Sequence, residues 1–95
     1  AAQVFYPDID PGEAARWATK LRSGNTGGNI VVEKAAWRTT PATYVVCKDD
    51  PILLVDGQRA VAERMGADVV EMPGDHSPMV ARPAELADIL VALLD

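Results

Sequence analysis

One stretch of the chain, residues 44–76, restricts the possible folds more than any other. It begins with a run of apolar side chains at residues 44–47, and a second, largely apolar run occupies residues 69–72 after a helical pattern. The apolar residues of the first run are consecutive, which is typical of a strand covered on both faces in a parallel sheet. The order strand, helix, strand predicts an α/β fold with a βαβ unit, whose parallel strands span residues 42–47 and 67–72.

Polar side chains follow each of these two predicted strands. Asp49 and Asp50 come directly after the first, and His76 follows the second beyond a Pro-Gly turn. Because the carboxyl ends of parallel strands meet at one edge of a sheet, where ligands and catalytic groups collect, we expect these side chains to lie close together. A carboxylate beside a histidine can fix its tautomer for proton transfer. The sequence thus indicates a pair between His76 and either Asp50 or Asp49.

Each of these residues also has a purely structural interpretation. His76 can be a surface residue of a Pro/Gly turn, and Asp50 can be a helix N-cap, because it precedes Pro51 and a helical pattern. Asp75 is adjacent to His76 and cannot readily fold back onto it. We therefore expect a structural or solvent-facing role for Asp75.

A nucleophile is missing from this arrangement. Ser23 lies in a glycine-rich stretch, Ser77 adjoins His76 too closely to place its hydroxyl beyond the ring, and the chain has no other serine and no G-x-S-x-G motif. Cys47 lies in an apolar strand, where a buried, unreactive thiol is expected. We also expect no metal and no cofactor, because the chain lacks the ligand spacing of metal sites and lacks a phosphate-binding loop.

Helical spacing of apolar side chains occurs in three segments, the crossover pattern at residues 52–65 and two others at residues 10–22 and 82–94. In the segment at residues 10–22, Asp10 is the expected N-cap, Glu13 completes a capping box, and the helix should end near Arg22. Residues 23–29 have the composition of a loop. Residues 30–37 fit either a strand or a short helix, and we favour the helix.

The predicted sheet is too small to be complete. Two parallel strands with their helices cannot bury both faces and both edges, and such a pair is not expected to be stable in water. Either residues 3–6 and 30–33 add strands, or the sheet is completed by polypeptide outside this sequence or by a partner chain. We favour completion from outside, within the single domain that 95 residues allow.

Composition excludes several classes of partner. Nine basic residues against fourteen acidic ones give a net charge of -5, without a basic stripe, so nucleic acid and anionic membrane surfaces are poor partners. The longest apolar runs are far shorter than the roughly 20 residues of a membrane span. The single cysteine excludes an internal disulfide. With no signal-peptide pattern at its start, the chain is expected in the cytoplasm.

Several of these features together resemble one family. The pattern Cys-x-x-Asp at residues 47–50 and the turn Gly-Asp-His-Ser-Pro at residues 74–78, with residues 66–72 and 82–90, resemble the C-terminal third of α/β-hydrolases. The branch named by this resemblance is the esterase group that includes plant methylesterases and hydroxynitrile lyases, with bacterial relatives. Residues 4–21 resemble the end of that branch's lid, so the resemblance spans nearly the whole chain.

The resemblance implies a partial α/β-hydrolase fold. Residues 1–40 would be a lid tail with a connecting helix, and residues 41–95 the C-terminal βαβα portion of the domain. By position, Asp50 corresponds to the acid and His76 to the base of a Ser-His-Asp triad, with Asp49 as the acid if the register shifts by one. The nucleophile elbow and the oxyanion hole have no counterpart here. We therefore expect part of a hydrolase of small-molecule esters, inactive alone.

A second function remains open. The chain can instead be a non-catalytic α/β fragment or interaction domain that dimerises through an exposed sheet edge, with Asp50 and His76 as relics. The sequence does not specify the substrate, because acyl and alcohol specificity in such enzymes comes from the lid and the pocket.

Overall fold

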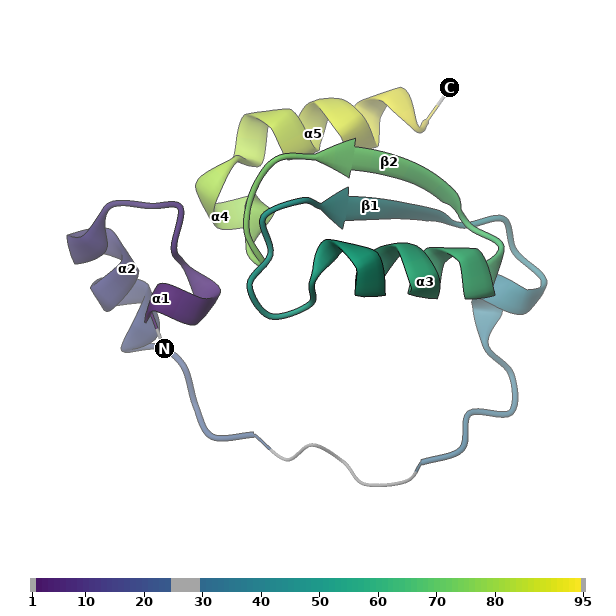
Figure 1. Ribbon diagram of the computed structural model, residues 1–95, viewed down its shortest axis with the longest axis horizontal. Coiled ribbons are helices and arrows are strands. Elements are labelled where there is room, and N and C mark those ends of the chain that lie inside the picture. Colours follow the sequence, from purple (N-terminus) through teal and green to yellow (C-terminus); the bar gives the residue numbers. More distant parts are fainter. Residues whose placement is uncertain (1, 25–29, 95) are drawn as a thin grey trace.

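A parallel pair of strands forms the centre of the molecule (Figure 1). The computed structural model describes residues 2–24 and 30–94. β1 spans Thr43–Cys47 and β2 spans Asp68–Met72, with Val45 opposite Val70 in the register. Both strands were predicted from the sequence to within one residue, and their carboxyl ends lie at the same edge of the sheet.

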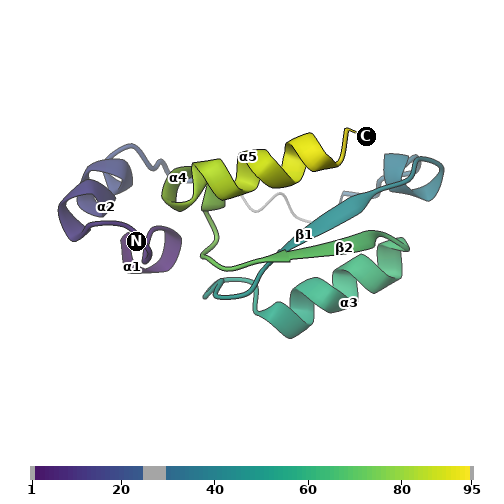
Figure 2. The ribbon, with the colours of Figure 1, turned by 90° about the horizontal axis from the view of Figure 1, so that it is seen from above.

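Helices lie on opposite sides of this sheet. α3, Val55–Met65, connects β1 to β2, and α5, Pro83–Ala92, lies on the other side (Figure 2). α3 packs on both strands, and its Ala62 is fully buried. This arrangement confirms the predicted α/β class and the βαβ unit. The short helix α4, Pro78–Ala81, precedes α5 and was not predicted.

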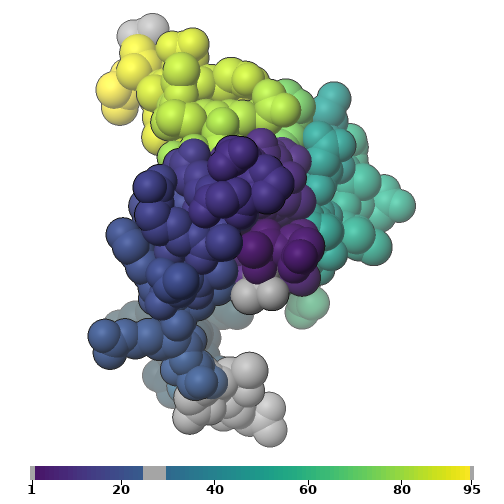
Figure 3. Space-filling view, turned by 90° about the vertical axis from the view of Figure 1, so that its left-hand side faces the viewer, coloured from purple at the N-terminus to yellow at the C-terminus, as the bar shows by residue number. Residues whose placement is uncertain are grey.

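Two N-terminal helices lie beyond the carboxyl ends of the strands. α1 spans Ala2–Phe5 and α2 spans Pro11–Ala18; Figure 3 shows them as one block, with α5 on one side and α3 on the other. Asp10 accepts a hydrogen bond from the Glu13 N–H at 3.1 Å, which confirms the predicted N-cap.

The end of α2 differs from the sequence prediction. The helix stops at Ala18 and not near Arg22. Beyond it the backbone tightens into bonds that span three residues, with the Leu21 N–H donating to the Ala18 carbonyl at 3.2 Å. The Thr19 hydroxyl donates back to the Arg16 carbonyl at 2.6 Å, a local bond that competes with helix continuation.

The prediction of a helix over residues 30–37 is wrong. Only a single 3₁₀ turn, η1 at Ala36–Arg38, forms there, and residues 30–35 are neither helix nor strand. The three β-branched residues at 30–32 are each at least 62% exposed, so no burial compensates for their low helix propensity. The predicted loop at residues 23–29 falls largely outside the described residues, which omit 25–29.

The sheet is incomplete in the described residues. Neither residues 3–6 nor residues 30–33 add a strand, so β1 has one unpaired edge. The apolar side chains buried around the sheet are Val46, Cys47, Ala62 and Met72. The architecture is thus a small α/β arrangement of two parallel strands with helices on both faces. Within the described residues, no helix has the length and apolar character needed to cross a bilayer.

Candidate functional site

Asp50 and His76 meet at the carboxyl edge of the sheet. His76 Nδ1 lies 2.8 Å from Asp50 Oδ2, although the two residues are 26 positions apart in the chain. Asp50 lies in the turn after β1 and His76 in the turn after β2. The parallel pairing of these strands therefore brings together the acid and the base that the sequence singled out.

The Asp50 carboxylate is buried and oriented by the backbone of its own turn. Oδ1 accepts hydrogen bonds from the N–H groups of Ile52 at 2.8 Å and Leu53 at 3.1 Å, which leaves Oδ2 for His76. Burial opposes ionisation and is the largest single influence on the pKa of Asp50. The hydrogen bonds from His76, Ile52 and Leu53, with the histidine charge, outweigh burial and lower the pKa of Asp50 below its ordinary value.

Asp50 is not the N-cap of α3, which was its alternative role. The helix begins at Val55 with Leu54 as its N-cap and without a side-chain capping bond. The two backbone bonds to Asp50 instead close a short turn ahead of the helix.

The contact with Asp50 determines the tautomer of His76. An ionised carboxylate can only accept hydrogen bonds, so Nδ1 must carry the proton that lies between the two groups. In the neutral ring, Nε2 is then an unprotonated acceptor. The His76 side chain is 41% exposed. The pair therefore presents a base that a proton donor can reach, with the ring held from its buried side.

The Asp49 carboxylate bonds to the backbone of Gly74, so that it joins the two turns, while Asp50 is the carboxylate that bonds to His76. Asp49 Oδ2 accepts from the Gly74 N–H at 3.0 Å, and the Asp49 N–H donates to the Gly74 carbonyl at 3.0 Å. Gly74 has φ of 124°, and a Cβ there would lie 3.1 Å from the Arg82 side chain. Glycine is therefore required where the turns of Asp50 and His76 are joined.

Asp75 is fully buried and has a structural role, which is one of the two roles expected for it; the other was a solvent-facing position. Its carboxylate accepts hydrogen bonds from the Ser77 N–H at 2.8 Å and from the Asp8 N–H at 3.2 Å. The ring of Phe5, in α1, lies 6.1 Å from that of His76, measured between centroids. These contacts attach the N-terminal helices to the histidine turn.

Cys47 is buried at the end of β1 and is poorly suited to act as a nucleophile. Burial, with the negative charges of Asp50 and Asp75, raises the pKa of its thiol, so the reactive thiolate is disfavoured. No cluster of three or more potential metal-ligating side chains occurs among residues 2–24 and 30–94.

Gln58 is the site residue that sequence reasoning missed. This side chain of α3 is 2% exposed, and its amide is bonded to the backbone of Cys47 and of Leu53. Its position carried a signal: Gln58 lies four residues before Ala62 and seven before Met65, on the helix face that turns to the sheet. A polar residue at such a position predicts a buried amide with specific partners.

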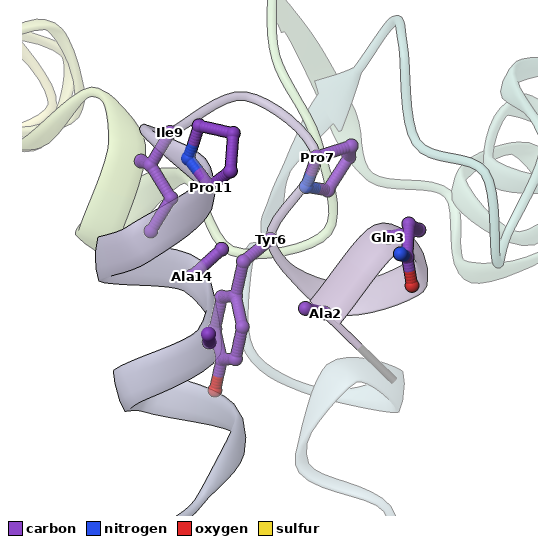
Figure 4. Close-up of a pocket in the computed structure, with 8 residues that line it drawn as sticks. Ala2, Gln3, Tyr6, Pro7, Ile9, Pro11 and Ala14 are labelled. Carbon is purple, nitrogen blue, oxygen red and sulfur yellow. The ribbon is translucent and has the colours of Figure 1, made fainter.

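Two hollows lie near these elements. One, of about 330 Å³, runs along β1 and includes both members of the pair; it is lined by Thr43, Tyr44, Val45, Cys47, Asp50, Leu53, Gln58, His76, Pro78 and Met79. The other, of about 290 Å³, lies between α1 and α2, where Tyr6 lies against Ala14 (Figure 4). Only the hollow along β1 contains Asp50 and His76, so a reacting group is best placed there.

A model of a known protein family matches this chain. The family is described as the alpha/beta hydrolase family, and the match covers residues 1–89. The chain therefore belongs to the alpha/beta hydrolase family. No solved structure gives a significant match.

A curated protein gives a more specific similarity. Methylesterase 2 from Arabidopsis thaliana is 41% identical to this chain over 59 residues, which are 60% of the chain and 22% of the relative. The chain thus spans about a fifth of the length of the curated relative that it matches. The similarity makes the chain methylesterase-like over that part.

Proposed function

We propose that this chain supplies the acid and the base of a Ser-His-Asp triad in a carboxylic-ester hydrolase, with Asp50 as the acid and His76 as the base. The observation that carries the proposal is the 2.8 Å contact between Asp50 Oδ2 and His76 Nδ1, made by a buried carboxylate whose pKa is lowered. Membership of the alpha/beta hydrolase family and similarity to a methylesterase support ester chemistry. The substrate is a small-molecule ester.

In this reaction the serine comes from polypeptide outside the present sequence. His76 Nε2 takes the proton of the serine hydroxyl as its oxygen attacks the ester carbonyl, and the imidazolium is stabilised by Asp50. The same proton then passes to the departing alcohol, which leaves an acyl-enzyme. Water, deprotonated by His76, releases the acid and restores the serine.

The isolated chain should not turn over an ester. Neither of its serines lies in a G-x-S-x-G motif, and removing the nucleophile of a serine hydrolase costs roughly 10⁶-fold in kcat. Purified chain with p-nitrophenyl acetate should therefore show only the background rate. Turnover that disappears in a His76→Ala variant would contradict this expectation.

A graft tests the catalytic roles directly. Residues of this chain replace the matching segment of Methylesterase 2, and hydrolysis of p-nitrophenyl acetate is measured. His76→Ala in the graft should lower kcat by at least about 10³-fold, because it removes the base, and Asp50→Asn by about 10²–10⁴-fold, because it removes the group that holds the tautomer.

The matched control for these variants is Asp88→Asn. Asp88 lies exposed on α5, so its substitution removes one carboxylate without touching the pair and should leave kcat unchanged. The proposal fails if the graft is active and His76→Ala leaves kcat within a few-fold of the parent.

A further inference from the structure

The Gln58 side chain acts as a peptide-like bridge at the base of the Asp50 turn. Its Oε1 accepts from the Cys47 N–H at 2.8 Å, and its Nε2 donates to the carbonyls of Cys47 at 2.7 Å and Leu53 at 2.8 Å. Both amide hydrogens are therefore donated and the amide oxygen accepts one bond, and the three partners are all backbone groups. At 2% exposure, water cannot replace these bonds without opening the structure.

These bonds terminate the unpaired edge of β1. The Lys48 N–H donates to the Met72 carbonyl at 3.0 Å, on the side of β2. Successive residues of a strand direct their backbone N–H and carbonyl groups to opposite edges, so the N–H and carbonyl of Cys47 face the edge away from β2. The Gln58 amide hydrogen-bonds to both of these groups. A further strand along this edge cannot pair at Cys47.

The same bonds hold both ends of the turn that carries Asp50. Cys47 lies three residues before Asp50 and Leu53 three residues after it, and one rigid amide connects them. The Asp50 carboxylate in turn accepts a hydrogen bond from the Leu53 N–H at 3.1 Å, so the backbone position of Leu53 fixes the orientation of the carboxylate. The free Oδ2 is thereby aimed at His76 Nδ1.

We propose that Gln58 is a positioning residue for the Asp50–His76 pair, because its buried amide fixes the turn that aims Asp50 at the histidine. The inference rests on the proposed function for its catalytic meaning. Its geometric content can be tested in the chain as it stands.

The test is NMR spectroscopy of the isotopically labelled 95-residue chain. His76 is the only histidine, so a downfield Nδ1 proton signal is assigned without ambiguity, and the Asp50 carboxyl carbon can be titrated. Gln58→Met keeps the length and apolar bulk of the side chain but forms none of the three bonds. We expect loss of the downfield proton signal and a rise in the pKa of Asp50 toward its ordinary value.

Two further variants separate positioning from general destabilisation. Ala62→Gly weakens the same buried face of α3 without touching the amide, and should keep both the Nδ1 signal and the low pKa of Asp50. Gln58→Glu keeps the acceptor for the Cys47 N–H but loses both donors. If the methionine variant does not fold, the glutamate variant supplies the test, and its Nδ1 signal should weaken or vanish.

The outcomes also distinguish the two proposals. If folded Gln58→Met, or Gln58→Glu in its place, keeps the full Nδ1 signal, Gln58 is not a positioning residue, while the catalytic roles of Asp50 and His76 stand. If Ala62→Gly loses the signal as completely as the Gln58 variants, the role of Gln58 is general stability and the proposal is overturned. A wild-type chain that shows neither the Nδ1 signal nor a lowered pKa of Asp50 would overturn the role of Gln58, whereas the catalytic roles are tested separately in the graft.

Discussion

Asp50 shows how one side chain can combine burial with full ionisation. It has three hydrogen-bond donors, two from the backbone of its own turn and one from His76. Each donor favours the charged carboxylate over the neutral acid, and together they offset the cost of removing the charge from water.

This balance predicts a pH dependence of stability. The pKa of Asp50 in the folded chain lies below the ordinary value of 3.8, so the folded state binds its proton more weakly than the unfolded state. The resulting stabilisation is complete above that ordinary value and is lost as the pH falls through the folded pKa. Thermal melts from about pH 6 down to about pH 2.5 should show this loss in the wild type and a shallower slope in Asp50→Asn.

The exposed Asp88 again provides the comparison for this experiment. Asp88→Asn should keep the slope of the wild type, because its carboxylate forms no buried hydrogen bonds to lose. Equal slopes for Asp50→Asn and the wild type would contradict the role assigned to the buried carboxylate.

Single residues also show what sequence reasoning could and could not reach. Asp50 and His76 were predictable as neighbours, because the register of two parallel strands alone brings their ends together. Choosing Asp50 over Asp49 by contact with the histidine needed the structure. The partners of Gln58 are backbone groups of a turn, and no spacing of side chains encodes where that turn will lie.

At the level of elements, the junction between α3 and β2 depends on Gly66. This residue ends the helix with φ of 66° and has no atoms within 4 Å of the place where a Cβ would lie. The cost of a side chain there is therefore conformational and not steric with neighbours.

Gly66→Ala should accordingly destabilise the chain by about 1–2 kcal/mol, the cost of the left-handed conformation. For a domain of this size such a change lowers Tm by about 4–8 °C per kcal/mol, which is measurable by circular dichroism. Gly24→Ala is the matched control, because its Cβ also meets nothing within 4 Å and its φ is not in the left-handed region. A Tm of Gly66→Ala no lower than that of Gly24→Ala would contradict the argument.

Elements with strong tertiary burial were the ones that the sequence predicted well. Both strands fall where the apolar pattern placed them, because that pattern reflects burial on the sheet. The crossover helix α3 ends at Met65 as predicted but begins at Val55, three residues later than the predicted start at residue 52. Residues 30–37 have a similar apolar content but no surface to pack against in the described chain, and the expected helix is absent. Propensity without burial is a weak guide to structure.

The molecule as a whole is less compact than its length predicts. Its radius of gyration is 15.1 Å, against about 12 Å for a compact domain of 95 residues. Its accessible surface is 7151 Å², against about 5,300 Å² from the scaling of surface with mass. The excess is more than twice the roughly 800 Å² that each partner buries in a standard protein–protein interface, so this one chain leaves enough surface uncovered for such an interface.

This excess predicts self-association of the purified chain through the unpaired edge of β1. Size exclusion with light scattering should give a mass above the monomer that rises with concentration. Backbone groups of alternate residues in β1 face the same edge, so the N–H of Val45 lies on the unpaired edge together with that of Cys47. Val45→Pro removes this N–H and should shift the mass toward the monomer. A wild-type monomer at all concentrations that melts cooperatively would contradict the prediction.

Asp75 gives the molecule one further property. A single buried carboxylate accepts from Asp8, beside α1, and from Ser77, beside His76. Moving the N-terminal helices away would leave this charge with one donor fewer in a site that excludes water, which carries a free-energy cost. The packing of the N-terminal helices and the stability of the histidine turn are therefore thermodynamically linked. A change that stabilises the packed position of the helices stabilises the histidine turn by the same free energy, and the reverse also holds.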